Sequence, residues 1–422
     1  MTEYNPKTMI LTNFGQYFQA YSLTIVVERQ IKMLREGGFK PVVTVMEGFQ
    51  PQGEFAQPDI ELVYLPKVAC HNEWDRDTKE IYNADVAKIK EALRPALKGV
   101  KNVLTHDLFF QASTQKFDDA CRELIPEFPD IRWLHMVHSC VPSRRKPKFP
   151  NSFIIYPNGY DIPRVAKGYG FEEHEIKVVP HPIDVCGFFE MNPISEKIIK
   201  KYDILMADFI MTYPLRLDRG KQPEMCIKIM KELKKMGKSV KMIFMDFHST
   251  AGDKVKYREE LKLMAVDYGL NDHEVIFVSE QDPAVKLESP RGMVKDFMAI
   301  SNIFCLPSRS ETFSLVAQEA MITGNFPILN FDFMPMRSIY GNKPLYRKFS
   351  SNIGQDGMDG ETTTVYNDEG GKDSYFKDIA GYACYMLEHN NIMALRTQMR
   401  RDHNLKAVFK KYLEPLLYYR GK

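Results

Sequence analysis

The sequence predicts an α/β protein of two domains, each built on a doubly wound parallel sheet. With 422 residues, the chain exceeds the size at which a single hydrophobic core stops growing, so two domains of roughly 200 residues each are expected. Short apolar runs rich in β-branched residues alternate with longer helix-period segments through both halves, as in βαβ units. Apolar residues make up 44% and charged residues 27%, which excludes disordered and collagen-like classes.

Residues 1–185 are expected to form the first domain. A helix is predicted from Leu23 to Glu36, because Ile25, Val26, Ile31 and Leu34 fall near helical spacing and two glycines follow. The strand candidates, in order, are TMILTN, PVVTVM, IELVYLP, KNVLTHD, IRWLHMVHS and SFIIYP, and IKVVPHPID closes this half. Residues 186–203 are expected to be a linker.

Residues 204–395 repeat the pattern and are expected to form the second domain. Strands are predicted at DFIMTYPLR, VKMIFMDF, EVIFVSE, NIFCLPS and FPILNF, and helices at PEMCIKIMKELKKMG, YREELKLMAVDYGL and GMVKDFMAIS. The Gly/Asp/Ser/Thr-rich segment 350–374 is expected to be a surface loop. We expect the two domains to face each other across a cleft, because such sheets bind ligands at the carboxyl ends of their strands.

Composition limits where the protein acts and what it binds. The N-terminus has no signal-peptide pattern and no window of about 18 uncharged apolar residues occurs, so a cytoplasmic protein is expected. The seven scattered cysteines predict reduced, packed thiols. Residues 1–200 carry 25 Lys and Arg against 26 Asp and Glu, and the remainder 32 against 29, so any anion site must be local.

Two short motifs carry the chemistry. In PSRSETFSLVAQEAMITG, residues 307–324, Glu311 and Glu319 interrupt a segment that otherwise resembles an apolar helix. Alone, they would more simply be a solvated helix face with two ion pairs. The segment YPLRLDRGKQPE, directly after the first strand of the second domain, places Arg216 and Lys221 five positions apart.

Together these motifs resemble the paired-glutamate signature of the retaining GT-B glycosyltransferases that include glycogen synthase, sucrose synthase and phosphatidylinositol mannosyltransferases. VVERQIKMLREGGFKPVVTV resembles the first helix and second strand of that family, and VVPHPIDVCGFF its motif before the linker. The resemblance covers nearly the entire chain, in order. It implies two Rossmann-like domains, the first binding the acceptor and the second a nucleotide sugar, with a C-terminal helix at 396–422 crossing back to the first.

The resemblance implies a role for each motif residue. Arg216 and Lys221 would neutralise the diphosphate of a nucleotide sugar, most simply a UDP-sugar, as its charge increases. Backbone amides at the start of the motif's helix would add donors and the positive end of its dipole. Glu311 would accept hydrogen bonds from the sugar and Glu319 from the ribose. The amides are those of Phe313, Ser314 and Leu315.

The first domain would supply the acceptor side. LHMVHS resembles the family strand that ends in a histidine near the anomeric carbon, here His138, with a satisfied core histidine as the alternative. His135 would face the other way and pack. Gly15 occupies the place of the family's glycine-rich first loop, where the backbone approaches the diphosphate.

The sequence departs from the family in two places. Thr312-Phe313-Ser314 stands where the family has Gly-Phe-Gly, and the glycine pair after the next strand is missing, so the donor sugar stays unnamed. No metal or other cofactor is expected, and Asp75-Arg-Asp77 is interpreted as a chance D-x-D match. Retention without an obvious nucleophile favours front-face displacement, in which the leaving phosphate takes the acceptor proton.

A local excess of cations bears on the acceptor. Between Asp130 and Asp161 there is no carboxylate, while PSRRKPKFP follows His138. Together with a basic C-terminal segment, this loop favours a polyanionic acceptor, with solvated surfaces as the alternative. The acceptor candidates in the loop are Arg144, Arg145, Lys146 and Lys148.

The leading hypothesis is transfer to a hydroxylated base, such as a hydroxymethyl base, in phage duplex DNA, in the host cytoplasm. Transfer to a lipid-linked or glycan acceptor at a membrane surface is the first alternative. A non-catalytic protein that binds nucleic acid or nucleotide sugars on a GT-B scaffold is another. A GT-B epimerase or a phosphorylase is a further alternative, although no lysine site for pyridoxal phosphate is identified.

Overall fold

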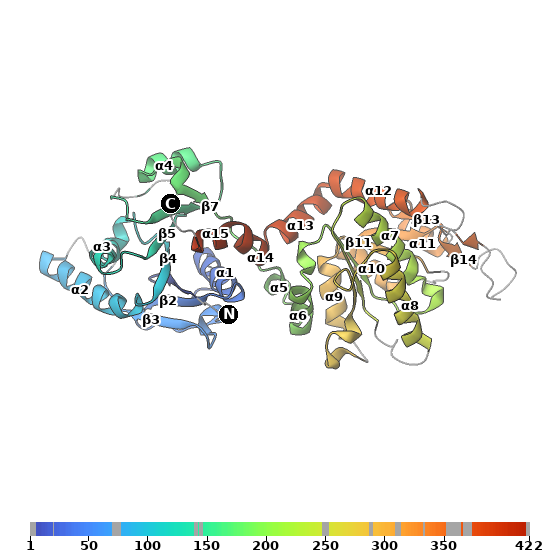
Figure 1. Cartoon of the computed structure of the whole chain (residues 1–422), viewed down its shortest axis with the longest axis horizontal. Coiled ribbons are helices and arrows are strands. Elements are labelled where there is room, and N and C mark those ends of the chain that lie inside the picture. The colour runs from blue at the N-terminus through green and yellow to red at the C-terminus, as the bar shows by residue number, and fades with distance from the viewer. Residues whose placement is uncertain are drawn as a thin grey trace. The chain divides into compact units, whose positions relative to one another are not determined.

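The computed structural model describes residues 6–19, 21–69, 77–138, 142, 147–246, 253–286, 290–308, 314–331, 334–351, 364–365 and 374–418. The chain divides into two compact units (Figure 1). Unit 1 comprises Met1–Ile183 and His403–Lys422, and unit 2 comprises Asp184–Asp402. The predicted fold class, α/β with two Rossmann-like doubly wound domains, is confirmed.

Unit 1 contains a seven-stranded sheet in the order β3-β2-β1-β4-β5-β6-β7. All neighbouring strands are parallel. The strands are β1 (Lys7–Leu11), β2 (Lys40–Met46), β3 (Glu61–Leu65), β4 (Val100–His106), β5 (Arg132–Met136), β6 (Ser152–Tyr156) and β7 (Ile176–Val178). The last strand is shorter than predicted, because the prolines at 180 and 182 have no N–H to donate to a neighbouring strand.

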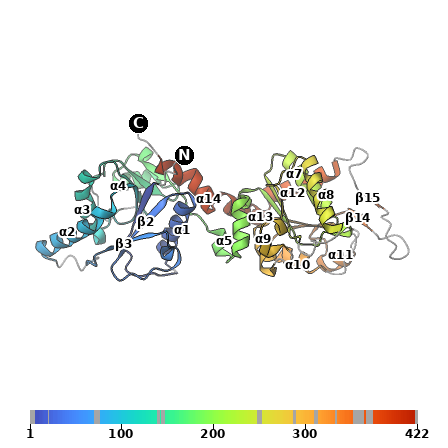
Figure 2. The same cartoon turned by 60° about the horizontal axis from the view of Figure 1, so that its bottom comes forward.

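Helices cover both faces of this sheet (Figure 2). Successive residues such as Met9 and Ile10 enter opposite cores, as the two-residue period of a strand requires. One core is covered by α2 (Lys79–Ala96), α3 (Gln115–Leu124) and α4 (Ile162–Tyr169). The other is covered by α1 (Ser22–Glu36) and by α14 (Leu405–Val408) and α15 (Glu414–Leu417) from the end of the chain.

Unit 2 has a six-stranded parallel sheet in the order β10-β9-β8-β11-β12-β13. Its strands are β8 (Phe209–Tyr213), β9 (Val240–Phe244), β10 (Val275–Phe277), β11 (Ile303–Leu306), β12 (Phe326–Asn330) and β13 (Leu345–Arg347). A short antiparallel pair, β14 (Ser350–Ser351) and β15 (Thr364–Val365), lies in the predicted surface loop, most of which is outside the described residues.

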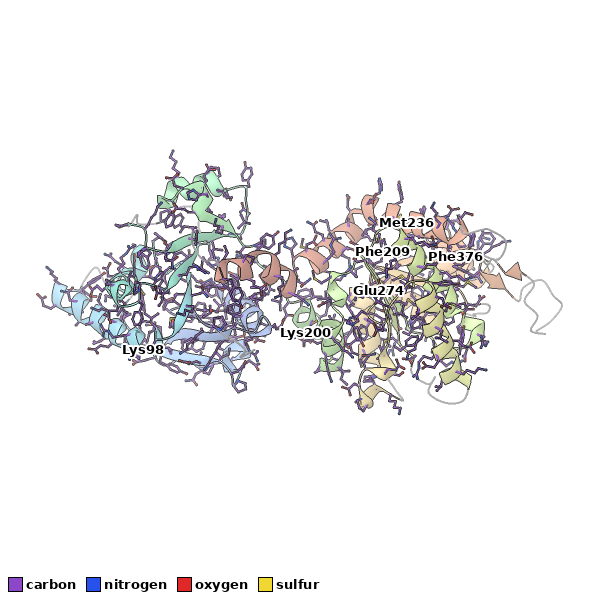
Figure 3. All side chains as sticks on the ribbon, in the orientation of Figure 1. Lys98, Lys200, Phe209, Met236, Glu274 and Phe376 are labelled. Carbon is purple, nitrogen blue, oxygen red and sulfur yellow. The ribbon has the colours of Figure 1, made fainter. Side chains whose placement is uncertain are left out.

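One face of this sheet packs against α7 (Pro223–Lys235), α8 (Asp253–Asp267) and α12 (Ser374–His389), and the other against α9 (Arg291–Ile300), α10 (Leu315–Ile322) and α11 (Met334–Tyr340). Figure 3 labels Phe209 and Phe376 of the first of these cores. The five cysteines in the described part of the chain are free thiols, and four are buried. No helix among the described residues is long and apolar enough to span a membrane.

Residues 186–203, expected as a linker, are instead part of unit 2. They form α5 (Val185–Phe188) and α6 (Pro193–Lys201), the second of which starts with an Asn192 side-chain cap on the Ile194 amide. The chain crosses between the units at 183–184 and at 402–403. Beside these crossings, the Ile183 amide donates to the His403 carbonyl at 2.7 Å.

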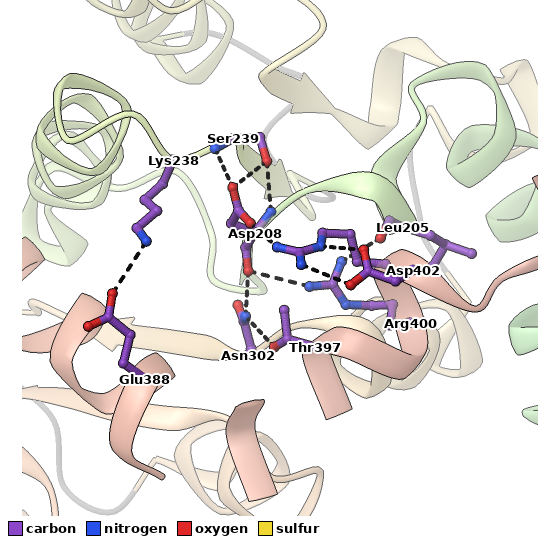
Figure 4. A network of polar contacts seen from close by, with 10 residues as sticks. Leu205, Asp208, Lys238, Ser239, Asn302, Glu388, Thr397, Arg400 and Asp402 are labelled. Carbon is purple, nitrogen blue, oxygen red and sulfur yellow. Dashed lines mark hydrogen bonds and ion pairs between the residues drawn. The ribbon is translucent and has the colours of Figure 1, made fainter. Parts of the chain in front are cut away.

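The last helix of unit 2, α13 (Asn391–Asp402), is held on its sheet by a polar network in which Arg400 is buried (Figure 4). Arg400 donates to the Leu205 carbonyl at 2.8 Å, and Arg401 pairs with both Asp208 and Asp402. Asp208 also accepts from the amide and hydroxyl of Ser239, at 2.8 and 2.7 Å. The chain therefore leaves unit 2 from a fixed point.

Candidate functional site

Both sheets have a topological switch point, where the strand order changes direction between the first and fourth strands. In unit 2 this point lies between β8 and β11, and in unit 1 between β1 and β4. Open α/β sheets bind ligands outside the carboxyl ends of the strands at such points. Arg216 and Lys221 follow β8, and the motif beginning at Pro307 follows β11. The switch point of unit 2 therefore brings the two sequence motifs to one edge.

The loop after β8, which carries Arg216 and Lys221, has its backbone held by contacts with neighbouring elements. The Arg216 side chain is 60% exposed, and its Nε lies 3.5 Å from the Asp218 carboxylate. The Lys221 carbonyl accepts a hydrogen bond from the buried Tyr213 hydroxyl at 3.1 Å. Arg219 pairs with Glu260 at 2.7 Å, so the backbone between the two predicted cations is tied to α8.

Gln222 connects this loop to the end of β11. Its side chain is 1% exposed, and its Nε2 donates to the Pro307 carbonyl. The residue has a φ of 51°, in the left-handed region that non-glycine residues rarely occupy. A residue keeps such a conformation only where its surroundings enforce it, and here the contacts of Gln222 hold the two strand ends close together.

Ser314, predicted as part of the donor site, caps α10. Its φ is 62°, and its side chain accepts from the Ala317 amide at 3.3 Å. A left-handed backbone favours glycine, which is the residue at this place in the family that the sequence resembles. The predicted donor residue Leu315 begins the helix, with a 66% exposed side chain.

Glu319 lies on α10 and pairs with Arg291 of α9 at 2.8 Å. The Arg291 side chain is 89% exposed and that of Glu319 35% exposed. Both line a cavity of about 380 Å³ between the two helices, together with Val294, Met298 and Thr323. The carboxylate thus reaches solvent but already has a cationic partner.

Five predicted site residues lie outside the described residues, namely Glu311, Phe313, Arg144, Arg145 and Lys146. Of the basic loop, Lys148 is described, and it pairs with Glu175 at 2.5 Å. Gly15 lies beyond the end of β1, and a Cβ built there would meet no atom within 4 Å, so the fold itself does not require glycine at this place.

The basic C-terminal segment is mostly engaged within the protein. Arg396 donates to the Ala299 carbonyl at 3.1 Å, and Arg400 and Arg401 belong to the network that anchors α13. Lys410 pairs with Glu414 at 2.6 Å. These cations therefore have partners within the protein, which leaves fewer of them available to a polyanionic acceptor.

In unit 1, three histidines stack at or just beyond the carboxyl ends of the strands. His106 is the last residue of β4, and His138 lies two residues beyond β5. Their rings are 5.5 Å apart at 13°, and the His138 ring lies 5.4 Å from that of His181 at 19°. The His106 Nδ1 lies 3.2 Å from the His138 Nε2.

Burial keeps these imidazoles uncharged. It lowers the pKa of His138, and together with the neighbouring histidines it lowers the pKa of His106 well below its usual range. Burial, with the charges of His138 and Arg29, lowers the pKa of His181 to about 4. The backbone N–H of His138 donates to Asp107 at 3.0 Å, which fixes the loop that carries the half-buried ring.

His135 is a packed histidine, as the sequence predicts. It is 1% exposed, its Nδ1 lies 3.1 Å from the Thr105 hydroxyl, and the rings of Phe109, Phe110 and Phe149 surround it. It therefore belongs to the core of unit 1.

Four residues of these two regions were not predicted from the sequence, namely Gln30, His106, His181 and Gln222. Both histidines stand at the ends of predicted strand segments, THD and VVPHP, and that position is the signal that could have found them. Asp77 of the D-x-D match pairs with the buried Lys116, and no cluster of three metal-ligating side chains occurs among the described residues.

Part of the chain, within unit 2, is similar to a known protein family. Residues 194–342 match the family model described as glycosyl transferases group 1. This range includes Arg216, Lys221, Glu311 and Glu319. No curated protein matches the chain.

Several solved structures align over nearly the whole chain. A glycosyltransferase from Rickettsia africae has 12% identity, 98% coverage of each chain and a TM-score of 0.35. HepE of Anabaena, in complex with UDP and glucose, has 13% identity, covers 98% of this chain and 99% of its own, and has a TM-score of 0.34. Sucrose-phosphate synthase from Thermosynechococcus elongatus has 14% identity, coverages of 98% and 96%, and a TM-score of 0.33. At such low sequence identities and TM-scores, these similarities do not indicate an activity.

Proposed function

We propose that the protein is a GT-B glycosyltransferase that moves a sugar from a nucleotide-sugar donor to a hydroxyl acceptor. The observation that carries the proposal is the meeting of two loops at the switch point of unit 2. One loop bears Arg216 and Lys221, the other leads into α10, and Gln222 joins them. The same part of the chain matches the glycosyl transferase group 1 model.

The donor binds through its diphosphate and ribose. Arg216 presents a forked donor and Lys221 a point charge to the phosphate oxygens, and the first amides of α10 add neutral donors with the helix dipole. Glu319 accepts from the ribose hydroxyls after its side chain exchanges Arg291 for the nucleotide. An exposed ion pair of this kind is worth roughly 0–1 kcal/mol, so the exchange costs little.

The reaction proceeds with retention by front-face displacement. The bond between the anomeric carbon and the phosphate oxygen breaks, and the acceptor oxygen forms its bond to the same face of that carbon. The acceptor proton passes to the departing phosphate. Fixed cations stabilise the charge that develops on the diphosphate, and Glu311 holds the donor sugar.

The acceptor proposal is a polyanion, and hydroxymethylated duplex DNA is the candidate to test first. Its support is the carboxylate-free stretch between Asp130 and Asp161, which contains Arg144, Arg145 and Lys146. Cations of this stretch would contact the DNA backbone while the base leaves the stack.

A transfer assay tests the proposal. The full chain is incubated with labelled UDP-glucose and a panel of other nucleotide sugars, each with hydroxymethylated duplex, unmodified duplex or anionic lipid vesicles. Label in hydroxymethylated DNA alone supports the DNA acceptor. Label in the vesicles replaces it with a lipid acceptor and keeps the glycosyltransferase, whereas no transfer and no donor hydrolysis with any sugar contradicts the enzyme itself.

A further inference from the structure

We propose that Gln30 and His106 are positioning residues that hold His138 in one tautomer, with its proton on Nε2 and a lone pair on Nδ1. His138 then receives a hydrogen bond from a hydroxyl group and does not bind an anion. The identity of that hydroxyl, on the donor sugar or the acceptor, rests on the proposed function. The tautomer itself does not.

The series of hydrogen bonds that ends at His138 starts at Gln30, on α1. Its side chain is 2% exposed and lies between two groups, with Nε2 against the Met136 sulfur and Oε1 2.9 Å from the His106 Nε2. A thioether sulfur has no hydrogen to give and acts only as a weak acceptor. The amide nitrogen of Gln30 therefore faces the sulfur, and its carbonyl oxygen faces His106.

The carbonyl oxygen decides the tautomer of His106. Because an oxygen of this kind only accepts, the His106 Nε2 must carry the proton. A neutral imidazole has one donor and one acceptor nitrogen, so the His106 Nδ1 carries a lone pair. Burial at 4% exposure, with a pKa well below the usual range, keeps the ring neutral.

The lone pair of His106 then decides the tautomer of His138. The His138 Nε2, 3.2 Å away, must donate to it, which leaves the His138 Nδ1 as an acceptor. The two rings are nearly parallel at 13°, and His181 stacks on the other side of His138. Together with the Asp107 contact to its backbone, these neighbours limit the rotation of the ring.

The opposite arrangement is less favourable. If the Gln30 amide were turned over, its oxygen would face the lone pairs of the Met136 sulfur and no hydrogen would lie between them. Every proton along the chain would then move to the other nitrogen, and His138 would present an N–H from Nδ1. Met136 is the last residue of β5 and pairs in register with His106 of β4, and its side chain is buried, so the sulfur has little room to move away from Gln30.

This assignment restricts what His138 can bind. An acceptor lone pair on a neutral ring repels a phosphate or carboxylate oxygen, whereas an O–H group fits it. His138 therefore selects a hydroxyl, and any phosphate of the substrates must be held by cations elsewhere in the chain.

Nuclear magnetic resonance of the full chain, with histidine labelled with nitrogen-15, tests the tautomer without any substrate. The chain has ten histidines, and a His138→Asn spectrum identifies the signals of this ring. We expect correlations in which the His138 Nε2 carries the proton and Nδ1 resonates as a lone-pair nitrogen. A protonated Nδ1, or a charged ring at pH 7, overturns the proposal.

A substitution and a matched control sharpen the test. Gln30→Leu removes the acceptor for His106, so the His138 signals should move toward a mixture of tautomers. Gln50→Leu, the same change at an exposed position of the same unit, should keep the wild-type pattern. If Gln30→Leu leaves the His138 signals unchanged, the positioning role is wrong.

Kinetics separate this inference from the proposed function. Once a donor and an acceptor are established, Gln30→Leu should lower kcat about 10-fold, because His138 no longer holds the lone pair that accepts a hydrogen bond from the substrate hydroxyl. The KM for the nucleotide sugar should change less than about 2-fold, because phosphate binding does not depend on His138. A tautomer that matches the expectation in a protein without transferase activity would contradict the proposed function alone.

Discussion

Gln222 and Pro307, 85 residues apart in sequence, are joined by a buried hydrogen bond from the glutamine amide to the proline carbonyl. The bond ties the loop after β8 to the end of β11, on the two sides of the switch point in unit 2. It holds the loop with the predicted cations close to the start of the motif that is proposed to bind the donor.

Gln222→Leu should lower the free energy of unfolding by about 1–3 kcal/mol, because it keeps the side-chain volume but leaves the buried Pro307 carbonyl without this donor. The KM for the nucleotide sugar should rise as the two loops separate. Urea unfolding and steady-state kinetics measure the two effects. Gln50→Leu, at an exposed position, is the control, and equal behaviour of the two variants would refute the role of Gln222.

Ser314 allows a test with opposite signs at a single position. Ser314→Ala loses the cap on the Ala317 amide and keeps a Cβ in the left-handed region, so it should destabilise the protein by about 1 kcal/mol. Ser314→Gly loses the same cap but relieves roughly 1–2 kcal/mol of backbone strain, so it should be neutral or stabilising. Thermal unfolding of both variants decides, and a glycine variant less stable than the alanine variant would contradict this account.

Substitutions in the Arg291–Glu319 pair distinguish a ligand-binding role of the Glu319 carboxylate from a structural role. Glu319→Ala should weaken UDP binding by about 10-fold or more, because two ribose hydroxyls lose a charged acceptor. Arg291→Ala should leave the affinity unchanged or improve it, since it removes the competing partner. Isothermal titration calorimetry with UDP compares the two variants. If Arg291→Ala weakens binding as much as Glu319→Ala, the ion pair has a structural role.

Stability should fall as the pH falls below about 6.5, and His135 should contribute measurably. Burial and Arg122 lower its pKa to about 3, from an ordinary value of 6.5. Between these values the unfolded chain binds a proton at His135 that the folded chain does not, so this contribution is complete above pH 6.5 and decreases toward pH 3. The slope from one such group approaches about 1.4 kcal/mol per pH unit.

Urea unfolding at pH 7, 6 and 5 measures this loss. His135→Gln keeps a partner for the Thr105 hydroxyl and removes the titrating group, so its unfolding free energy should fall less steeply with pH. His174→Asn, at an exposed position of the same unit, is the control. Equal slopes for wild type and His135→Gln would show that another group carries the effect.

Much of the fold could be predicted from local patterns. The strands of both sheets are short apolar runs, and β8 and β11 end where Arg216 and Pro307 follow, so the sequence predicts that each motif follows a strand. That β8 and β11 are neighbours, which brings the motifs together, is known only from the strand order of the sheet. Helix α6 was missed within the expected linker, although Asn192 at its cap and Pro193 in its first turn are ordinary signals of a helix start.

The contacts that orient the site could not be predicted. Gln30 and His106 are 76 residues apart, and His106 and His138 meet only because β4 and β5 are neighbours in the sheet. Likewise, the arginines of the C-terminal segment look like a basic surface in sequence, but Arg400 is 6% exposed and bonds to backbone carbonyls. Charge counts along a chain do not show which cations have internal partners.

The most direct test of the central claim is calorimetric titration of UDP into the full chain, its Arg216→Ala and Lys221→Ala variants, and a Lys98→Ala control at an exposed site in unit 1 (Figure 3). We predict one site on the wild-type protein, affinity weakened about 10-fold or more in each of the first two variants through loss of charge-assisted bonds to the diphosphate, and no change in the control. Wild-type affinity in Arg216→Ala and Lys221→Ala, or no binding of UDP and of any other nucleoside diphosphate to the wild-type protein, would contradict a donor site at the switch point of unit 2.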